Sequence, residues 1–372
     1  MCKRFFVVFG TRPEAIKLFP VIKRLQIENA VGTTVCVTAQ HREMLDQVLE
    51  LTNVVPDIDL DLMQPSQTLD QLASRILLAV GETLDRVRPD RVIVQGDTAT
   101  AMASALAAYH RRIPVAHVEA GLRSGDIYAP WPEEINRKIV TSIADQHFAP
   151  TTRAAEALNK ENVPSDRIYV TGNTVIDALL AIKKLIDSDR TLANRWNEIR
   201  ERQGNRRIIL VTTHRRENFG GGMDRIADAL LQIIARDDVA IVLPVHLNPN
   251  VRDVLVSRLA NQPRVEMIAP QGYADFVGLL SLASIVLTDS GGVQEEAPSL
   301  GKPVLVMRDT TERPEGIIAG TARLVGTDRA KIVGETFRLL DERDHYVAMS
   351  QAHNPFGDGF ASDRIVKVML DA

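Results

Sequence analysis

The sequence contains little cysteine and no long apolar run. Only two cysteines, Cys2 and Cys36, occur in 372 residues, which excludes a disulfide framework and a cysteine-rich zinc site. No segment approaches the roughly 18 consecutive apolar residues of a membrane-spanning helix. The apolar run at residues 5–9 is too short for the core of a secretory signal. We therefore expect a cytoplasmic protein that does not enter the membrane.

An excess of charge of one sign and the common cofactor motifs are also missing. The 44 Lys and Arg residues nearly balance 48 Asp and Glu residues without a basic block, so we expect no nucleic-acid partner. The patterns G-x-G-x-x-G and G-x-x-x-x-G-K-[ST] are absent, which argues against nicotinamide-dependent redox chemistry and ordinary ATP hydrolysis. None of the eight histidines belongs to an H-E-x-x-H motif, and the serine-hydrolase pattern G-x-S-x-G is absent. We expect neither a metal ion nor a cofactor.

Short apolar runs that end in Gly, Asp or Thr alternate with helical periodicity along the chain. At roughly 150 residues per domain, this length predicts about two domains. Strands rich in β-branched residues that alternate with helices are typical of parallel sheets covered on both faces. The predicted fold class is therefore α/β, with two doubly wound, Rossmann-like domains facing a cleft and a ligand at the carboxyl ends of the strands.

The boundary between the domains is predicted after residue 171, ahead of the polar, charged stretch 187–206. The predicted strands are 4–9, 34–39, 91–95, 115–118, 146–149 and 167–170 in the first domain, and 207–212, 239–245, 265–269, 285–288, 303–307 and 324–326 in the second. The predicted helices are 13–26, 41–51, 69–87, 98–109 and 151–161, followed by 223–235, 275–282, 294–300 and 330–341.

The end of the first predicted strand carries a glycine turn that opens a helix. Thr11 and Glu14 have the spacing of a capping box, and Gly10 precedes them. Free N–H groups at a helix start favour an anion, and Arg12 and Lys17 add positive charge there. A well-capped first helix with a solvated lysine explains the same residues, so this segment alone does not decide between the two interpretations.

Carboxylates follow the next strand ends of the first domain. Asp97 follows strand 91–95, where it fits an N-cap as well as a catalytic acid. Glu119 follows strand 115–118 and is placed to form a local ion pair with Arg123. Glu133 and Glu134 open a helix, where the macrodipole favours acids in any case. Their location at neighbouring strand ends predicts that Asp97, Glu119 and Glu133 surround one pocket, as acid and base roles require.

The second domain carries a glycine pair after an apolar strand. Ser290 is placed to cap the following helix, and Gly291 and Gly292 let phosphate oxygens approach backbone N–H groups. Glu296, one turn later, is placed to accept hydrogen bonds from ribose hydroxyls, and Arg313 follows. A nucleotide site explains this combination better than a structural turn with dipole-favoured acids.

Two histidines also lie near strand ends of the second domain. His214 stands between an apolar strand and two arginines, which suits an anionic leaving group, although a solvated charged loop explains it too. His246 fits a cap or a packing role as well as a functional one.

Longer motifs carry a family resemblance. They are FGTRPEAIK at 9–17, VTAQHREMLDQ at 37–47, GDT at 96–98, HVEAGLR at 117–123, PWPEEINR at 130–137, TGNTVIDAL at 171–179, THRREN at 213–218, PVHLNPNVR at 244–252, LTDSGGVQEEAPSLGKPVLVMRDTTERPEG at 287–316 and NPFGDG at 354–359. All of them in this order make the sequence resemble the bacterial non-hydrolysing UDP-N-acetylglucosamine 2-epimerases over essentially its whole length.

The resemblance implies a glycosyltransferase-B-like fold with a catalytic domain at 1–171, a UDP-binding domain at 172–355 and a C-terminal helix at 356–372 that packs back on the first domain. It implies reversible C2 epimerisation of UDP-N-acetylglucosamine to UDP-N-acetylmannosamine, through elimination of UDP to a 2-acetamidoglucal and re-addition. The product would supply N-acetylmannosamine units for cell-surface polysaccharides. A homodimer and, in some members, activation by UDP-N-acetylglucosamine at a second site are implied as well.

The resemblance also implies three sets of residues. The nucleotide and its diphosphate would be bound by Arg12, Gln271, Phe276, Ser290, Gly291, Gly292, Glu296 and Arg313. The reacting centre would consist of Lys17, Asp97, Glu119, Glu133 and His214. The candidates for the second, allosteric site are Gln40, His41, Glu134, Arg215 and His246. We expect carboxylates to transfer the protons and His214 with the cations to assist departure of UDP, and no motif assigns one carboxylate to a particular face of the sugar.

Three other functions fit the same fold. One is a glycosyltransferase, one a relative that hydrolyses the UDP linkage while epimerising, and one an inactive sugar-nucleotide sensor. The acids of the first domain favour the epimerase over a transferase, which needs an acceptor site rather than an acid/base pair. The presence of every residue of the predicted reacting centre argues against a sensor.

Overall fold

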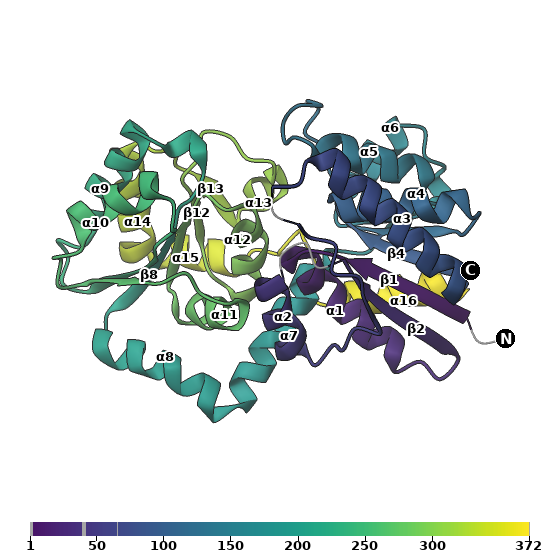
Figure 1. Ribbon diagram of the computed structural model, residues 1–372. Helices are drawn as coiled ribbons and strands as arrows, with labels where there is room; N and C mark the ends of the chain where they lie inside the picture. The colour runs from purple at the N-terminus through teal and green to yellow at the C-terminus, as the bar shows by residue number, and fades with distance from the viewer. Residues whose placement is uncertain (1–2, 39–41, 65, 372) are drawn as a thin grey trace. The chain divides into compact units, whose positions relative to one another are not determined.

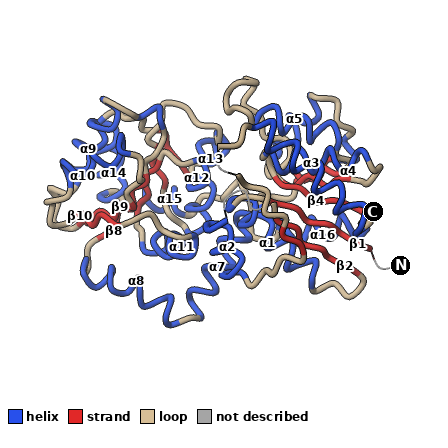
Figure 2. The backbone as a smooth tube through the Cα atoms, viewed as in Figure 1, coloured by secondary structure: helices blue, strands red, loops and turns tan. Residues whose placement is uncertain are grey.

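The chain folds into two compact units, which we describe from a computed structural model covering residues 3–38, 42–64 and 66–371. Unit 1 is built from Met1–Ala178 and Gly357–Ala372, and unit 2 from Leu179–Phe356. In each unit, helices alternate with the strands of one open sheet (Figure 1, Figure 2). The predicted α/β class with two doubly wound units is confirmed.

Unit 1 contains a seven-stranded sheet in the order β3-β2-β1-β4-β5-β6-β7, in which every adjacent pair is parallel. The strands are β1 (Lys3–Phe9), β2 (Val31–Val37), β3 (Ile58–Asp59), β4 (Arg91–Gln95), β5 (Val115–Val118), β6 (Gln146–Ala149) and β7 (Ile168–Val170). Residues 5–9 of the central strand β1 are all apolar and fully or nearly fully buried, as expected for a parallel strand covered on both faces.

The helices of unit 1 follow its strands. They are α1 (Arg12–Gln26), α2 (Arg42–Thr52), α3 (Leu69–Val87), α4 (Ala99–His110), α5 (Glu133–Ile143), α6 (Thr152–Lys160), the start of α7 (Thr174–Ser188) and α16 (Ala361–Asp371). Phe6 and Val8 of β1 pack in one buried cluster with Leu72 and Ile76 of α3 and with the alanine-rich α4. The small side chains of α4 let this helix approach the sheet closely.

The last helix of the chain belongs to unit 1. Figure 1 shows α16, drawn in yellow, beside α1 and β1 at the other end of the sequence. Lys3 Nζ donates to the carbonyl of Leu370 at 2.7 Å, and Arg24 Nε pairs with Asp363 at 2.7 Å. Asp177 accepts the backbone N–H of Ser362 at 2.7 Å. These bonds fix the first turn and the last turn of α16.

Unit 2 contains a six-stranded parallel sheet in the order β10-β9-β8-β11-β12-β13. The strands are β8 (Arg207–Thr212), β9 (Val239–Pro244), β10 (Val265–Ile268), β11 (Ile285–Thr288), β12 (Val304–Val306) and β13 (Ala322–Leu324). The helices are α8 (Arg190–Gln203), α9 (Gly221–Ile233), α10 (Pro249–Leu259), α11 (Tyr273–Leu282), α12 (Gly291–Glu296), α13 (Pro314–Ala319), α14 (Arg329–Asp341) and α15 (Arg343–Ser350). Ile226 of α9, Leu255 of α10 and Ile332 of α14 share one core cluster with the sheet.

The polar stretch 187–206, to which the sequence assigned no element, contains helix α8. Among its described side chains, Trp196 and Ile199 are apolar and buried, and their spacing of three residues places them on the same helical face. Trp196 packs against Gly278 of α11, where even one added methyl group would lie about 2.5 Å from the indole ring. The many charged residues around these two positions hide the helical pattern in the sequence.

Both sheets reverse their strand order at a defined place. In unit 1 the reversal lies between β1 and β4, and in unit 2 between β8 and β11. Open parallel sheets bind ligands outside the carboxyl ends of the strands at this switch point, because the following helices diverge to opposite faces. The fold therefore directs attention to the loops after β1 and β4, and after β8 and β11.

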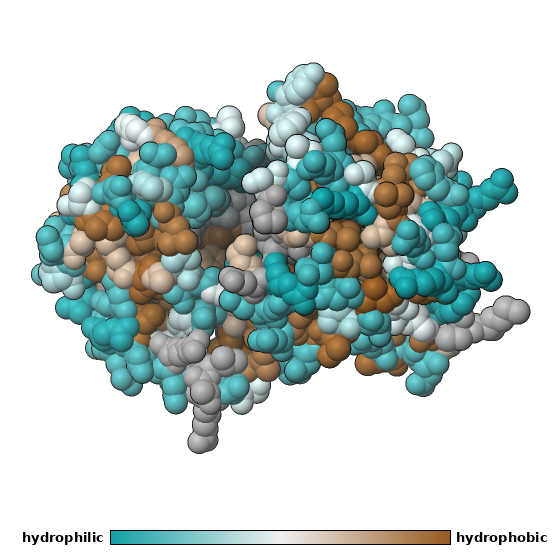
Figure 3. All heavy atoms as spheres, in the orientation of Figure 1, coloured by the Kyte–Doolittle hydropathy of each residue, from teal (hydrophilic) through white to brown (hydrophobic). Residues whose placement is uncertain are grey.

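Hydrophilic residues cover most of the face drawn in Figure 3, with hydrophobic residues in scattered patches. Large exposed apolar side chains include Leu78 of α3 and Tyr109 of α4. Among the residues that the structure describes, no helix combines the length and apolar character needed to cross a membrane. Within the same residues, no group of three His, Cys, Asp or Glu side chains is arranged to hold a metal ion.

Candidate functional site

The loop after β1 is organised by a buried glutamate. Thr11 and Glu14 form the predicted capping box of α1, which is confirmed. Glu14 Oε2 accepts from the backbone N–H of Gly10 at 3.1 Å and of Thr11 at 2.8 Å, while Oε1 accepts from Thr98 Oγ at 2.7 Å. Burial raises the pKa of the Glu14 carboxyl, and the hydrogen bonds from Thr98 and Thr11 oppose that rise. Glu14 thus joins the loop after β1 to the loop after β4.

Glu119 follows β5 and is held by groups from three other segments. Its side chain lies 2.6 Å from Lys17 Nζ of α1, and Asn173 Nδ2 donates to Oε1 at 3.1 Å. Gln95, the last residue of β4, donates to Oε2. Glu119 has a φ of 62°, in the left-handed region where a glutamate is uncommon. A buried carboxylate in such a backbone conformation requires these partners.

Two alternative interpretations from the sequence are wrong here. Glu119 does not pair with Arg123, because Arg123 binds Glu161 with nitrogen-to-oxygen distances of 2.8 and 2.6 Å. Lys17 is not a solvated lysine, because it forms an ion pair with Glu119 and only 20% of its side chain is exposed.

Asp97 follows β4 and is bound from helix α5. Arg137 forms an ion pair with its carboxylate, and Asn136 Nδ2 donates to its backbone carbonyl at 2.9 Å. The N-cap interpretation of Asp97 is wrong, because Thr98 is the N-cap of α4 and accepts from the N–H of Ala101 at 3.0 Å. The Asp97 side chain is 29% exposed, so it remains accessible to a ligand.

The acids at the start of α5 differ in exposure. Glu134 is fully buried, and its Oε2 accepts from Arg137 at 3.0 Å and from the N–H of Ser124 at 3.2 Å. Glu133 is half-buried and makes no side-chain hydrogen bond to the described residues. Glu134 therefore supports the arginine that binds Asp97, whereas Glu133 has no structural task of this kind.

The backbone that carries Asp97 passes close to Glu119. Gly96, which precedes Asp97, has a φ of 69°, and a Cβ built on it would lie 3.6 Å from Glu119 Oε2. His117, two residues before Glu119, is fully buried and bonds the carbonyl of Gly96 at 2.8 Å through Nε2. Burial lowers the pKa of His117 to about 3, so this histidine is a neutral core group. The structure thus places the residue before Asp97 beside Glu119, while the predicted pocket formed by Asp97, Glu119 and Glu133 stays a prediction.

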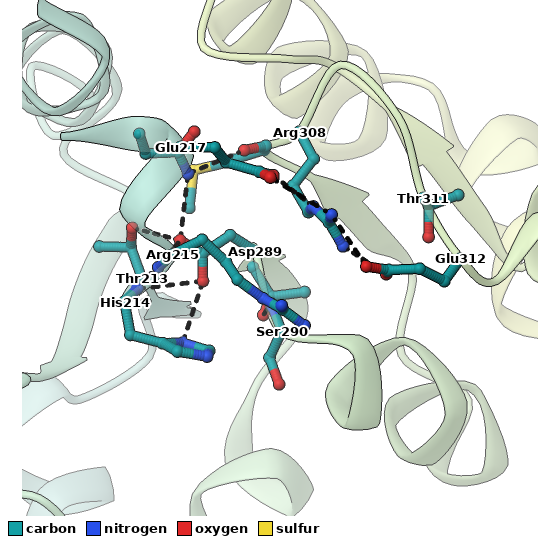
Figure 4. A network of polar contacts seen from close by, with 12 residues as sticks. Thr213, His214, Arg215, Glu217, Asp289, Ser290, Arg308, Thr311 and Glu312 are labelled. Carbon is teal, nitrogen blue, oxygen red and sulfur yellow. Dashed lines mark hydrogen bonds and ion pairs between the residues drawn. The ribbon is translucent and has the colours of Figure 1, made fainter. Parts of the chain in front are cut away.

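The switch point of unit 2 is built around Asp289, which follows β11 and is fully buried (Figure 4). Its carboxylate accepts from Thr213 Oγ at 2.8 Å and from the backbone N–H groups of His214 and Arg215, both at 2.9 Å. The Nδ1 atom of His214 lies 3.1 Å from Oδ1. Burial alone would raise the pKa of the Asp289 carboxyl, but the hydrogen bonds from His214 and Arg215 hold it below its usual value.

The loop 213–218 is anchored on two further sides. The His246 ring stacks on the His214 ring with centroids 5.9 Å apart and an interplanar angle of 28°. Arg308, nearly buried, pairs with Glu217 of this loop and with Glu312 (Figure 4). Hydrogen bonds from Arg308 lower the pKa of Glu312 to about 2 against the opposing effect of burial. The His214 side chain is 39% exposed, so a fixed loop presents it to solvent.

The glycine pair after β11 starts a helix. Ser290 is the N-cap residue of α12, but the prediction that its side chain caps is wrong, because it makes no capping hydrogen bond. Gly291 and Gly292 form the first helical turn, and a Cβ on Gly291 would lie 3.7 Å from an Arg215 nitrogen. The Ser290 hydroxyl is therefore not used for capping. It belongs to the residue next to the glycine pair, close to which Arg215 lies.

The other predicted nucleotide residues lie on neighbouring elements of unit 2. Tyr273 Oη donates to Glu296 Oε1 at 2.7 Å, and burial beside this carboxylate raises the pKa of the Tyr273 hydroxyl. Arg313 pairs with Glu295 at the start of α13. Gln271 Nε2 donates to the carbonyl of Ala269 at 2.6 Å, just before α11, and Phe276 is half-buried in the first turn of that helix.

Among the residues assigned to a second site, Gln40 and His41 lie outside the described residues. Glu134 is the buried partner of Arg137, and His246 is the stacking partner of His214. Arg215 binds Asp289 through its backbone N–H. In unit 1, Arg12 begins α1 and is half-buried, and it makes no side-chain hydrogen bond or ion pair with the described part of the chain.

Sequence reasoning missed several residues that hold the site. Gln95, Asn173 and Arg137 bind the acids of unit 1, and Asp289 binds the loop of unit 2. A usable signal existed for Asp289, because an aspartate that directly follows a buried strand and precedes a serine N-cap has no capping task itself. Gln95 offered no signal beyond its place at the end of β4.

Comparison with known proteins gives matches over nearly the whole chain. A family model described as UDP-N-acetylglucosamine 2-epimerase matches residues 23–370. A UDP-N-acetylglucosamine 2-epimerase from Salmonella typhimurium is 52% identical over 368 residues, covering 98% of both chains. A probable UDP-N-acetylglucosamine 2-epimerase from Ralstonia solanacearum is 54% identical over 369 residues, covering 99% of this chain and 98% of the relative.

A solved structure agrees with these sequence matches. The UDP-GlcNAc 2-epimerase from Neisseria meningitidis, bound to UDP-GlcNAc, superposes with a TM-score of 0.91 at 45% identity and covers 99% of this chain and 100% of that one. The predicted glycosyltransferase-B-like class, with two Rossmann-like units, is confirmed by this likeness and by the two parallel sheets.

Proposed function

Because the chain belongs to the UDP-N-acetylglucosamine 2-epimerase family, we propose that it interconverts UDP-N-acetylglucosamine and UDP-N-acetylmannosamine by eliminating UDP and adding it back. The observation that carries this mechanism is the pair of carboxylates at the ends of the adjacent strands β4 and β5. Asp97 and Glu119 are each held by a cation, at the switch point and beside it. An epimerase must remove a proton from one face of the sugar and return one to the other, which requires such acids and bases.

The chemistry explains why UDP has to leave. The C2 hydrogen has no neighbouring carbonyl group, so it is not acidic in the substrate. Breakage of the bond between C1 and the diphosphate oxygen builds positive charge at C1 and makes that hydrogen acidic. A carboxylate takes the proton while the bonding electrons depart with UDP, and a 2-acetamidoglucal remains. Proton delivery to the opposite face of C2, with UDP returning to C1, inverts the centre.

In this proposal unit 1 supplies the groups that transfer protons. Lys17, Gln95 and Asn173 keep Glu119 oriented. Arg137 orients Asp97, whose side chain remains partly exposed. Glu133 is a third candidate, because it is half-buried and has no structural partner among the described residues.

Unit 2 supplies the groups that bind and release the nucleotide. The backbone N–H groups at Ser290, Gly291 and Gly292 are suited to phosphate oxygens. Glu296, hydrogen-bonded by Tyr273, and Arg313, paired with Glu295, would bind the ribose and the diphosphate, together with Gln271 and Phe276. Arg12 of unit 1 would contribute as well. His214 would donate a proton to the departing diphosphate, and arginines would neutralise its charge.

The second-site candidates are connected to the same groups. Glu134 shares Arg137 with Asp97, and His246 stacks on His214. A ligand that contacted Glu134 or His246 would therefore change the support of a reacting residue. On this basis we also propose activation by UDP-N-acetylglucosamine, and, from the family alone, a cytoplasmic homodimer that supplies N-acetylmannosamine units for cell-surface polysaccharides.

Incubation with UDP-N-acetylglucosamine in deuterated water tests the proposed reaction. We expect deuterium at C2 of both epimers at equilibrium, with the sugar still joined to UDP, as measured by NMR and mass spectrometry. The Asp97→Asn variant is the matched control and should exchange deuterium far more slowly. Net release of UDP with free N-acetylmannosamine would instead support the hydrolytic alternative, and absence of exchange would contradict an epimerase.

A further inference from the structure

The two oxygens of Asp289 have different tasks (Figure 4). Oδ2 accepts four hydrogen bonds, from Thr213 Oγ at 2.8 Å, His214 N at 2.9 Å, Arg215 N at 2.9 Å and Asn218 Nδ2 at 3.0 Å. Oδ1 accepts a second, longer hydrogen bond from the same His214 N–H at 3.1 Å, and it faces the His214 imidazole, with Nδ1 also at 3.1 Å. Oδ2 therefore fixes the loop, and Oδ1 joins the loop to the ring that it carries.

The protonation pattern of this contact follows from the donors. Backbone and amide N–H groups can only donate, so Oδ2 must be an acceptor, and Asp289 has no exposed surface where water could replace them. Burial raises the pKa of the Asp289 carboxyl, but hydrogen bonds from the His214 ring, the Arg215 N–H and Thr213 hold the pKa below its usual value, so the carboxyl is ionised at neutral pH. An ionised Oδ1 has no hydrogen to offer, so the hydrogen of this contact must come from His214 Nδ1.

The His214 ring is also held on one of its faces, by stacking. His246 stacks on His214, and its Nδ1 accepts the backbone N–H of Asn248 at 3.1 Å. Neutral His246 therefore carries its hydrogen on Nε2. The two stacked rings have opposite hydrogen positions, and the His214 plane is held by a hydrogen bond at one edge and a ring on one face.

We propose that Asp289 is a positioning residue that holds His214 with its hydrogen on Nδ1, so that Nε2 is the ring nitrogen that exchanges a proton with the departing diphosphate. The role of Nε2 in proton exchange rests on the proposed function of His214, whereas the hydrogen position on Nδ1 does not. In the elimination, the ring begins protonated on both nitrogens and gives its Nε2 proton to the diphosphate oxygen as that oxygen takes the electrons of the C1–O bond, which leaves the neutral ring with its hydrogen on Nδ1. In the return step Nε2 takes the proton back, while Nδ1–H stays on Asp289.

Nitrogen NMR on the full chain with labelled histidine tests the hydrogen position directly. The His214 signals are assigned by their loss in His214→Gln. In the neutral ring of the wild-type protein we expect a protonated Nδ1 and an unprotonated Nε2. A neutral ring with its hydrogen on Nε2 would overturn the proposal without any variant of Asp289.

The Asp289→Asn variant tests the cause. Four donors surround the Oδ2 position, and only one of them, the His214 N–H, also approaches Oδ1, at 3.1 Å. We therefore expect the amide to place its oxygen at the Oδ2 position and its NH₂ group at the Oδ1 position, facing His214 Nδ1. An NH₂ donor there forces neutral His214 to carry its hydrogen on Nε2. Reversal of a catalytic histidine in this way lowers kcat about 10⁴-fold in a Ser-His-Asp triad, and we expect a fall of about 10²–10⁴-fold here, with a much smaller change in KM.

Thr213→Val is the matched control, because it removes only the hydroxyl donor at Oδ2 and leaves the contact between Oδ1 and Nδ1. We expect its His214 to keep the wild-type hydrogen position. An Asp289→Asn protein whose His214 stays protonated on Nδ1 would contradict the proposal, as would a Thr213→Val protein with the reversed pattern. If Asp289→Asn does not fold, the wild-type spectrum still decides. Failure of C2 exchange in deuterated water would refute the proposed function and leave the hydrogen position of His214 as measured.

Discussion

Asp97 of unit 1 and Asp289 of unit 2 occupy corresponding places in two sheets of the same topology. Each follows the strand on the far side of the switch point, β4 in one unit and β11 in the other. Asp97 is partly exposed and has one cationic partner, Arg137. Asp289 is fully buried and accepts hydrogen bonds from a whole loop.

The difference teaches that surroundings assign the role of a carboxylate, and the position in the fold does not. Asp97 meets solvent and one arginine, so its carboxylate is open to a substrate. Asp289 has no exposed surface and accepts hydrogen bonds from its whole loop, so it is kept ionised and anchors that loop. In the proposed mechanism the reactive group of unit 1 is the carboxylate itself, whereas the anchor of unit 2 presents a histidine.

The largest effect should come from removing the charge of the unit 1 acids. We expect Asp97→Asn and Glu119→Gln each to lower turnover of UDP-N-acetylglucosamine by about 10²–10⁴-fold, the usual contribution of a general acid or base. The measurement is the initial rate of epimerisation at saturating substrate, with the fold checked by circular dichroism.

Glu161→Gln is the control for these variants. It removes the ion pair with Arg123, on the chain segment that follows β5, without touching Asp97 or Glu119. Its turnover should stay near that of the wild type. Near-normal turnover in both Asp97→Asn and Glu119→Gln would show that neither acid transfers a proton, and would contradict the proposed difference between these acids and Asp289.

The loss of stability should be larger at Asp289 than at Asp97. Asp289→Ala leaves several buried N–H donors without an acceptor, so we expect the free energy of unfolding to fall by about 3–5 kcal/mol. Asp97→Ala removes one partly exposed ion pair and should cost about 1 kcal/mol or less. Urea denaturation followed by tryptophan fluorescence and circular dichroism measures both. Equal losses would show that Asp97 is an anchor as well.

Local patterns in the sequence predicted most of the fold and little of what holds the site. The capping box at Thr11 and Glu14 and the strands at 91–95, 115–118 and 285–288 depend on neighbours in the chain, and the structure has them as predicted. The partners of the acids are distant in sequence. Arg137 lies 40 positions from Asp97, and Asn173 lies 54 positions from Glu119, so only the folded sheet brings them together.

Element ends show a related limit of sequence patterns. The strand predicted at 324–326 is β13 at Ala322–Leu324, because Gly326 has a φ of 62° and leaves the extended conformation. The helix predicted at 294–300 instead begins at Gly291, since the glycine pair is helical and does not form a separate turn. Glycine permits both outcomes, and only the position of the preceding strand selects one.

The stability of the protein should also depend on pH, because unit 1 buries neutral histidines in its sheet. Burial lowers the pKa of His117 to about 3 and that of His147 to about 4. Below the ordinary histidine pKa of about 6.5 the unfolded chain binds protons that the folded chain does not. The free energy of unfolding therefore falls as the pH drops from about 6.5 towards 4, by up to about 1.4 kcal/mol per pH unit for each residue.

Thermal unfolding between pH 7 and 4.5 measures this dependence. His117→Gln keeps an amide donor for the carbonyl of Gly96 and cannot titrate, so its melting temperature should fall less steeply with acid than that of the wild type. His110→Gln replaces an exposed histidine at the end of α4 and serves as the control. Identical slopes for His117→Gln and the wild type would contradict the assignment of His117 as a buried neutral group.

The smallest effect distinguishes the two N-cap residues beside the two aspartates. Thr98 caps α4 with its hydroxyl and also donates to Glu14, whereas the Ser290 side chain makes no capping bond to α12. Thr98→Ala should therefore lower the free energy of unfolding by about 1–2 kcal/mol, and Ser290→Ala by a few tenths of a kcal/mol at most.

The affinity for UDP should change more in Ser290→Ala than in Thr98→Ala. UDP affinity, measured by isothermal titration calorimetry, should weaken in Ser290→Ala, because in the proposed site that hydroxyl binds the diphosphate. A Ser290→Ala protein that lost as much stability as Thr98→Ala and bound UDP normally would place Ser290 with Thr98 as a structural cap.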